Sequence, residues 1–282
     1  MRVIHDVQEM RAANHAATLQ KLTIGFVPTM GALHDGHLSL VRVARSRTSM
    51  VVVSIFVNPL QFGPTEDFNQ YPRTLEADCA RLEGEGVDLV FAPSAAQMYP
   101  TGATTVVHVE GLSDKLDGRS RPGHFRGVST VVAKLFHIVQ PDFAVFGQKD
   151  AAQVAVLRRM VRDLNMPVEL IVAPIVRETD GLALSSRNVY LTAEQRKQAL
   201  ILHRALNQVE SLAASGETNA EKLRALGLSV LASEPAAQLD YFEFIDANTL
   251  EPLEDTAQGA LVAVAAFFGV TRLIDNLLLS PR

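Results

Sequence analysis

Two histidines three positions apart, His34 and His37, are the residues of this chain that most directly suggest chemistry. They lie in the segment PTMGALHDGH, residues 28–37, which also carries two glycines. Side chains three positions apart can share one face of a helical turn, and glycine lets a backbone come close to a ligand. Two imidazoles beside a phosphate can donate hydrogen bonds to the charge that develops during transfer. The residue types and their spacing therefore favour phosphate binding.

Three other interpretations of this segment are open. A His-x-x-His pair can hold a metal, although no third ligand lies nearby in a suggestive pattern. The two histidines can also be ordinary loop residues. The glycine spacing matches that of a phosphate-binding P-loop, but His37 and Leu38 stand where that loop needs Lys followed by Ser or Thr.

The elements around this segment predict where it lies in the fold. Residues 23–27 form a short apolar run typical of a strand, and residues 38–45 repeat apolar side chains at helical spacing. Residues 50–57 are a β-branched run typical of a strand buried on both faces of a parallel sheet. Strand, helix and strand in this order predict a βαβ unit. The histidines then follow a strand and begin a helix, which is the usual ligand position in such sheets and suits phosphate.

The same alternation continues through the first 174 residues. Further helices are predicted at 74–85, 128–139 and 151–164, and further strands at 87–91, 143–146 and 168–172. This order predicts a doubly wound, Rossmann-like α/β domain with a parallel sheet over residues 1–174.

The pattern changes after Pro174. Residues 192–195 have the spacing of a helix-capping box and begin a predicted helix that ends near residue 214. A second helix is predicted at 219–233, followed by three strands at 239–245, 260–268 and 271–278. Helices followed by consecutive strands predict a smaller α+β domain over residues 175–282.

The composition excludes several classes of protein. A single cysteine, Cys79, rules out a disulfide within the chain and a cysteine-rich zinc site. The net charge of −5 gives no broad basic surface for nucleic acid. The longest apolar run, residues 260–268, is far shorter than the roughly 20 residues that cross a bilayer, and the N-terminus lacks the apolar core of a secretory signal. We therefore expect a cytoplasmic protein with no membrane or nucleic-acid partner.

Several blocks of the sequence resemble one family. The block MGALHDGH, residues 30–37, is similar to the His-x-Gly-His signature of the nucleotidylyltransferase superfamily, and the longer string PTMGALHDGHLSLV resembles the pantothenate synthetase (pantoate–β-alanine ligase) family. The other matching blocks are FVNPLQF at 56–62, YPRT at 71–74, RPGHFRG at 121–127, FGQKDA at 146–151 and LSSRN at 184–188. The short histidine motif is moderately specific, whereas all of these blocks in this order are highly specific.

The resemblance implies a two-step reaction. ATP and (R)-pantoate give pantoyl adenylate and pyrophosphate, and the amine of β-alanine then attacks the adenylate to give pantothenate and AMP. Both nucleophiles belong to substrates, so the protein needs no activated Ser or Cys but must position the reactants and stabilise charge on the α-phosphate. Two alternatives are a nucleotidylyltransferase that adds AMP to a phosphorylated acceptor and a nucleotide-binding sensor without turnover. A tRNA synthetase is disfavoured because the chain is short and acidic.

The resemblance also assigns roles to individual residues. It implies that His37 is catalytic and nearest the transferring phosphate, with His34 assisting. The ATP-binding residues that it implies are Met30, Gly31, Ala32, Leu33, His34, Asp35, Gly36, His37, Gly147, Gln148, Lys149, Asp150, Val176, Leu184, Ser185, Ser186 and Arg187. Substrate binding is implied for Asn58, Gln61 and Gln153, with Gln61 placed against both substrates and Gln153 against pantoate.

Some of these positions also allow other interpretations. The family usually has Glu at position 148 and commonly Met at 184, so Gln148 and Leu184 are departures. Asp78 is a magnesium contact by resemblance, although its place in a predicted helix favours a solvated face. His124 and Arg126 suit either active-site lining or a surface loop. The resemblance further implies Mg²⁺ bound mainly through the phosphates, a second domain that acts as a lid, and a homodimer.

Overall fold

The computed structural model describes residues 1–64 and 66–282, and these form two compact units. The first unit consists of Met1–Gly147 and Val156–Ala173, and the second of Gln148–Ala155 and Pro174–Arg282. Each unit has its own sheet and its own hydrophobic core. Helix α7, Ala151–Asp163, begins in the second unit and ends in the first.

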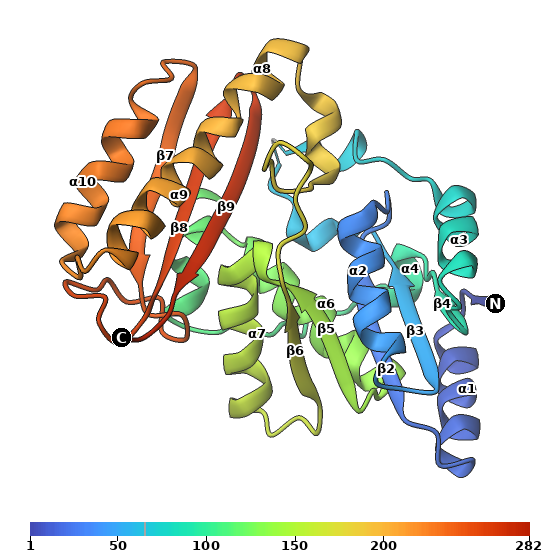
Figure 1. The fold of residues 1–282 in the computed structure, drawn as a ribbon. Helices are drawn as coiled ribbons and strands as arrows, with labels where there is room; N and C mark the ends of the chain where they lie inside the picture. Colours follow the sequence, from blue (N-terminus) through green and yellow to red (C-terminus); the bar gives the residue numbers. More distant parts are fainter. Residues whose placement is uncertain (65) are drawn as a thin grey trace. The chain divides into compact units, whose positions relative to one another are not determined.

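The first unit contains a six-stranded sheet in the order β1-β4-β3-β2-β5-β6, in which every pair is parallel (Figure 1). Its strands are β1 Arg2–Ile4, β2 Ile24–Thr29, β3 Met50–Ile55, β4 Leu89–Phe91, β5 Phe143–Gly147 and β6 Glu169–Ala173. The chain runs outward from β2 through β3 to β4, then returns to the other side of β2 with β5. The carboxyl ends of β2 and β5 therefore flank the topological switch point, where such sheets bind ligands.

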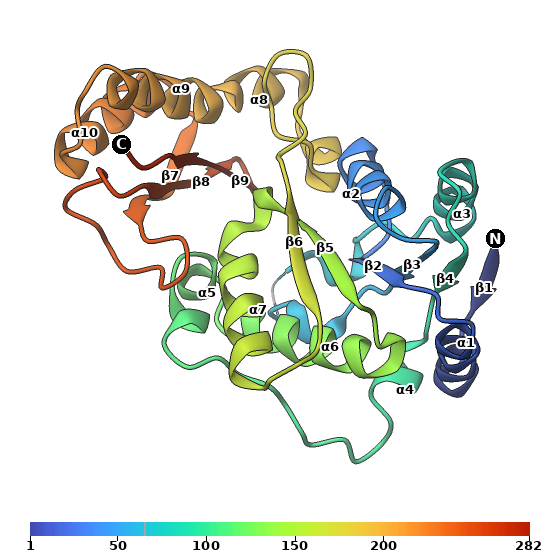
Figure 2. The ribbon, with the colours of Figure 1, turned by 60° about the horizontal axis from the view of Figure 1, so that its bottom comes forward.

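Helices cover both faces of this sheet. The helices that lie wholly in this unit are α1 Val7–Leu19, α2 Asp35–Arg45, α3 Leu75–Gly84, α4 Ala95–Met98, α5 Asp117–Ser120 and α6 His124–Val139, with 3₁₀ turns η1 Pro59–Gln61, η2 Asp67–Asn69 and η3 Leu112–Asp114. Figure 2 shows α2 and α3 on one face and α1 and α6 on the other. The central strands are buried on both faces, as in β3, where Met50 to Ser54 are all buried. A packed core between two helical layers holds the loops at the strand ends in fixed positions.

The second unit contains an antiparallel sheet in the order β7-β8-β9. Its strands are β7 Ala237–Ile245, β8 Ala260–Phe268 and β9 Thr271–Leu279, and its helices are α8 Ala193–Gln198, α9 Leu200–Ala214 and α10 Ala220–Leu231. Helices α9 and α10 lie along one face of this sheet (Figure 2). Two 3₁₀ turns, η4 Gln148–Asp150 and η5 Ser186–Tyr190, carry residues that the sequence predicts to bind ATP.

The predicted fold class is confirmed: a Rossmann-like parallel sheet is followed by a small α+β unit. Two helices differ from their predicted extents. The helix predicted over 192–214 is broken at Ala199, which is fully buried in the second core. The helix predicted from residue 128 begins at His124, after Gly123 in a left-handed conformation. Among the described residues, no helix is both long and apolar enough to cross a membrane.

Candidate active site

The loop between β2 and α2 is built to bring its backbone close to a ligand. Gly31 has a φ of +83° and Ala32 a φ of +50°, both in the left-handed region. Glycine adopts this conformation freely, whereas alanine adopts it at a cost. The Thr29 hydroxyl accepts a hydrogen bond from Gly31 N–H at 3.2 Å and donates one to the Ser54 carbonyl at 2.7 Å. The turn is thereby tied to the end of the neighbouring strand.

The side chains of His34 and His37 form a capping box at the N-terminus of α2, in which each ring accepts one backbone hydrogen bond. His34 Nδ1 accepts from Gly36 N–H at 3.2 Å, and His37 Nδ1 accepts from His34 N–H at 3.3 Å. A backbone N–H can only donate, so neither Nδ1 carries a proton, and the proton of each neutral ring lies on Nε2. The two ring centroids are 4.1 Å apart. Both imidazoles are therefore Nε2–H donors at the positive end of a helix, an arrangement that suits phosphate oxygens.

Asp78, near the start of α3, fixes the backbone of the histidine loop. Its Oδ2 accepts from Ala32 N–H at 2.9 Å and from the Thr74 hydroxyl at 3.2 Å, and its Oδ1 accepts from Leu33 N–H at 2.8 Å. The Asp78 residue is only 2% exposed. The expectation of a solvated helix face is therefore wrong, because this carboxylate is buried and directed at the loop.

The same contacts decide whether Asp78 fits a metal. Both of its oxygens already accept hydrogen bonds from the protein. Over residues 1–64 and 66–282, no group of three or more His, Cys, Asp or Glu side chains is arranged to hold a metal ion. Mg²⁺ prefers six oxygen ligands in near-octahedral geometry. The donor set around Asp78 does not fit a protein-held magnesium ion.

Asn58 and Gln61 lie at η1, after the end of β3, and are nearly or fully buried. Asn58 Oδ1 accepts from Leu60 N–H at 3.2 Å and from the Tyr99 hydroxyl at 2.8 Å. Asn58 Nδ2 donates to Gln61 Oε1 at 3.0 Å and to the Gly127 carbonyl at 3.1 Å. The two side chains are thus in direct contact, and Asn58 is the residue that holds the Gln61 amide.

Gly127 explains how η1 comes so close to α6. A Cβ atom at this position would lie 2.0 Å from the Leu60 carbonyl oxygen, which is an impossible distance. Only glycine therefore lets the first turn of α6 pack against the main chain of η1.

His124 and Arg121 approach the Gln61 main chain from the start of α6. The Gln61 carbonyl lies 2.8 Å from His124 Nδ1 and 3.3 Å from Arg121 Nη2. Burial, with a smaller effect of the Arg121 charge, lowers the pKa of His124 to about 4, so the ring is neutral at physiological pH. Arg126 is exposed. His124 is therefore the first residue of α6, in contact with the Gln61 main chain, and is not a surface-loop residue.

In the second unit, η4 is tied to strand β9 by Asn276. Asn276 Nδ2 donates to the main-chain carbonyls of Gln148 at 3.0 Å and Lys149 at 2.9 Å, and the Gln148 side-chain amide donates to Asn276 Oδ1 at 3.0 Å. A glutamate at position 148 has no such donor when ionised, which gives the Gln148 departure a structural role. Lys149 Nζ lies 3.6 Å from Asp150 Oδ1, and Gln153 is partly buried in the first turn of α7.

The segment from Val176 to Arg187 folds back on itself in the same unit. Leu184 N–H donates to the Val176 carbonyl at 3.0 Å, and Arg177 makes a bidentate ion pair with Asp275 at 2.6 and 2.9 Å. The Ser185 hydroxyl accepts from Arg187 N–H at 3.2 Å and caps η5. One short turn thus carries Ser185, Ser186 and Arg187. The preceding part of the segment is held to β9 by the ion pair of Arg177 with Asp275.

The sequence interpretation gave no role to Arg121, Tyr99 or Asn276. Arg121 belongs to the block RPGHFRG, so its place beside His124 was a usable signal. Tyr99 and Asn276 carry no local signal, because their partners Asn58 and Gln148 lie 41 and 128 positions away.

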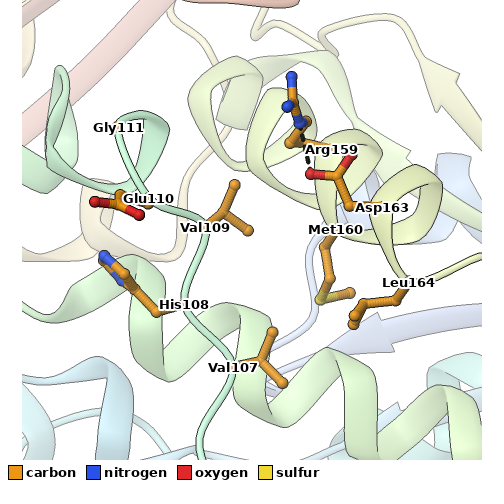
Figure 3. Close-up of a pocket in the computed structure, with 9 residues that line it drawn as sticks. All are labelled: Val107, His108, Val109, Glu110, Gly111, Arg159, Met160, Asp163 and Leu164. Atoms are coloured by element: carbon orange, nitrogen blue, oxygen red, sulfur yellow. Dashed lines mark hydrogen bonds and ion pairs between the residues drawn. The ribbon is translucent and has the colours of Figure 1, made fainter.

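A separate cavity of about 420 Å³ lies elsewhere in the first unit (Figure 3). It is lined by Val107, His108, Val109, Glu110, Gly111, Arg159, Met160, Asp163 and Leu164. Arg159 and Asp163 are paired with each other at 2.6 Å on the exposed side of α7. None of the residues that the sequence predicts to act on substrate lines this cavity, so it is not part of the candidate site.

Comparisons with known proteins point to one family. The family model described as pantoate-beta-alanine ligase matches residues 2–278. The pantothenate synthetase of Koribacter versatilis is 62% identical over 279 residues, which cover 99% of this chain and 96% of that protein. The pantothenate synthetase of Thermotoga neapolitana is 57% identical, over 99% of this chain and all of that protein.

Solved structures give the same result. The pantothenate synthetase of Thermus thermophilus superposes with a TM-score of 0.95 at 51% identity, over the full length of both chains. The pantoate-beta-alanine ligase of Francisella tularensis, solved in complex with beta-gamma ATP and beta-alanine, has a TM-score of 0.82 at 34% identity, over 99% of this chain and 97% of that one. With the paired histidines at the sheet's switch point and a match along nearly its whole length, this chain belongs to the pantoate–β-alanine ligase family.

Proposed function

We propose that this chain condenses (R)-pantoate with β-alanine, with ATP converted to AMP and pyrophosphate, through a pantoyl-adenylate intermediate. The observation that carries the proposal is the pair of Nε2–H imidazoles, His34 and His37, at the N-terminus of α2. Family membership supplies the substrates. The ligase activity is the function that both lines of support share.

The first step is attack of a pantoate carboxylate oxygen on the α-phosphorus of ATP, which forms the acyl–phosphate bond and breaks the bond to pyrophosphate. Negative charge on the α-phosphate oxygens rises as the two bonds exchange. His37, assisted by His34, donates to these oxygens, and the positive end of α2 adds to the stabilisation. Gly31 and Ala32 have left-handed backbone conformations, which let the main chain of this loop come close to the nucleotide. We propose that residues 30–37 bind ATP in this way.

The second step is attack of the β-alanine amine on the acyl carbon, with AMP as the leaving group. Neither step needs a nucleophile from the protein, which fits a site built from amides, imidazoles and backbone N–H groups. Because Gln61 Oε1 already accepts from Asn58, the Gln61 NH₂ group is the end that we propose meets the oxygens of pantoate. Gln153 is proposed as a further pantoate contact, on the basis of the family resemblance.

The second unit is proposed to act on the phosphates of ATP and to serve as a lid. Lys149 and Arg187 are cations, and Ser185 and Ser186 are hydroxyl donors, a combination that suits phosphate oxygens. Gly147, Gln148, Asp150, Val176 and Leu184 complete the proposed ATP-binding set. Its support is the residue chemistry and the match to the family over the whole chain.

We propose that Mg²⁺ accompanies ATP and is bound by phosphate oxygens, because the donor set at Asp78 does not fit the ion. A homodimer in the cytoplasm is proposed from the family resemblance. Light scattering after size-exclusion chromatography tests the dimer, and a monomeric mass would contradict it.

The test of the function is a substrate-dependence experiment. The protein is incubated with ATP, Mg²⁺ and pantoate, with and without β-alanine, and AMP, pyrophosphate and pantothenate are measured. We expect multiple turnovers only with both acids present, and exchange of labelled pyrophosphate into ATP with pantoate alone. AMP transfer to a phosphorylated acceptor without β-alanine would indicate the nucleotidylyltransferase instead. If no AMP forms with any combination of these substrates, the result would favour the non-catalytic nucleotide-binding sensor.

A further inference from the structure

Two polar side chains, one at the end of α5 and one at the start of α6, are not used by the proposed mechanism. Arg121 and His124 both contact the main-chain carbonyl of Gln61, at 3.3 and 2.8 Å. The Arg121 guanidinium also makes a bidentate ion pair with Glu66, at 2.9 and 2.6 Å. Glu66 follows η1 along the chain, so the Arg121 side chain contacts two positions there, the Gln61 carbonyl and the Glu66 carboxylate.

The orientation of the Gln61 amide is fixed by a chain of one-directional partners. Leu60 N–H can only donate, so the Asn58 atom facing it is Oδ1. The Gly127 carbonyl can only accept, so the Asn58 atom facing it is Nδ2. Nδ2 also faces Gln61, whose nearest atom must then be the acceptor Oε1. The Gln61 NH₂ group is therefore directed away from Asn58, as a double donor.

The tautomer of His124 is fixed in the same way. Its Nε2 lies 3.1 Å from Arg121 Nη1, and a guanidinium can only donate. Nε2 is therefore the acceptor, and the proton lies on Nδ1, which donates to the Gln61 carbonyl. The charged groups around the ring are Arg121, Asp117 and Glu66, and burial keeps the pKa of His124 far below its ordinary value. At physiological pH the ring is thus a neutral donor directed at the Gln61 carbonyl oxygen.

We propose that His124 and Arg121 are positioning residues for recognition of the acid substrate: they hold the Gln61 main chain, while Asn58 holds its amide, so that the Gln61 NH₂ group meets a carboxylate or hydroxyl oxygen. This inference rests on the proposed function, since it takes pantoate as the acid. Two donors on one carbonyl oxygen and a buried amide pair leave the Gln61 side chain little freedom. Pre-organised donors of this kind lower the cost of ordering a site on binding.

The test compares His124→Asn with His124→Leu. The asparagine amide nitrogen takes nearly the place of Nδ1 and keeps the donor, whereas leucine is of similar size and has none. We expect His124→Leu to raise the KM for pantoate about tenfold, with the KM for ATP changed less than about twofold, because one buried carbonyl loses its main donor. His124→Asn should stay within about threefold of the wild-type protein.

A double-mutant cycle with Gln61→Ala separates positioning from general destabilisation. If His124 acts through Gln61, His124→Leu adds no further increase in pantoate KM once the Gln61 amide is gone. An equal increase in both backgrounds, a parallel rise in the KM for ATP, or no rescue by His124→Asn would overturn the proposal. If His124→Leu does not fold, as judged by urea unfolding, Arg121→Met enters the same cycle and decides it.

Measurements on the wild-type protein distinguish failure of the positioning inference from failure of the proposed function. Pantothenate formation by the wild type establishes the proposed function before any variant is compared. An unchanged pantoate KM in His124→Leu then contradicts only the positioning inference. Absence of turnover in the wild type contradicts the proposed function itself, and pantoate binding by calorimetry, compared between the same two variants, still tests the positioning of Gln61.

Discussion

Replacing Asp78 with asparagine tests what holds the histidine loop in place. The substitution keeps size and shape but replaces one accepting oxygen by an NH₂ group. Whichever way the amide turns, its NH₂ faces a backbone N–H, that of Ala32 or that of Leu33. At least one N–H, half-buried at Ala32 or buried at Leu33, then loses the Asp78 acceptor and meets another donor.

The expected magnitude follows from these contacts. A buried N–H without an acceptor costs about 1–3 kcal/mol, and we expect the free energy of unfolding to fall by that amount. Ala32 holds a left-handed φ of +50° that alanine adopts only at a cost, so the loop will relax once its anchor weakens. A displacement of about 1 Å at reacting groups can lower a rate about 100-fold. We therefore expect adenylate formation to slow by about 10- to 100-fold.

The assay is single-turnover formation of pantoyl adenylate at a series of Mg²⁺ concentrations. Glu76→Gln is the control, because it removes the same charge from an exposed position in the first turn of α3. We expect the control to behave like the wild type, and the Asp78→Asn defect to persist at every Mg²⁺ concentration. Wild-type rates in Asp78→Asn, or rates restored by raising Mg²⁺, would refute the anchoring role and favour metal ligation.

Three further outcomes are expected. His37→Ala should slow adenylate formation at least about 100-fold while the thermal midpoint stays close to that of the wild type, because one preorganised donor to a charged oxygen is worth that much; single-turnover rates check it, and a wild-type rate contradicts it. Gln61→Ala should raise the KM for pantoate about tenfold or more and leave that for ATP unchanged, which steady-state kinetics measure. Burial lowers the pKa of His124 from 6.5 to about 4, so between these two pH values the unfolded chain binds more protons than the folded one, and the free energy of unfolding rises with pH by up to about 3 kcal/mol. Urea unfolding at pH 4.5 and 7.5 should show a larger loss of stability at low pH in the wild type than in His124→Asn. An equal loss in the two proteins would contradict the lowered pKa.

The fold could be predicted from the sequence because its signals are local. The β-branched run in β3 and the helical spacing in α2 each report burial of neighbouring residues, and burial follows from the apolar side chains themselves. The capping box at Thr192 is also local, since both partners lie within one turn. The break at Ala199 was missed because neither proline nor glycine marks it, and the residue is buried by the second core.

The candidate site could be predicted only in part, for the same reason. Residue types and spacing pointed to His34 and His37, whereas Gln61 was assigned only through the family resemblance. The sequence interpretation of Asp78 as a solvated helix residue was wrong, since its partners Ala32 and Leu33 lie 46 and 45 positions away. His124 was left between two interpretations, because its partner Gln61 is 63 positions distant.

By itself, the sequence determined the main alternation of strands and helices from residue 23 onward, the family, and the residue types available for phosphate and acid binding, but it did not predict β1, α1, α4 or α5. The tertiary structure decided which nitrogen of each imidazole carries the proton, which end of the Gln61 amide is directed away from Asn58, and that Asp78 anchors a loop. A hydrogen bond has a direction that depends on the partner atom, and periodicity along the chain reports burial but not partners. The chemistry of His34 and His37 is therefore suggested by spacing and set by the folded backbone around them.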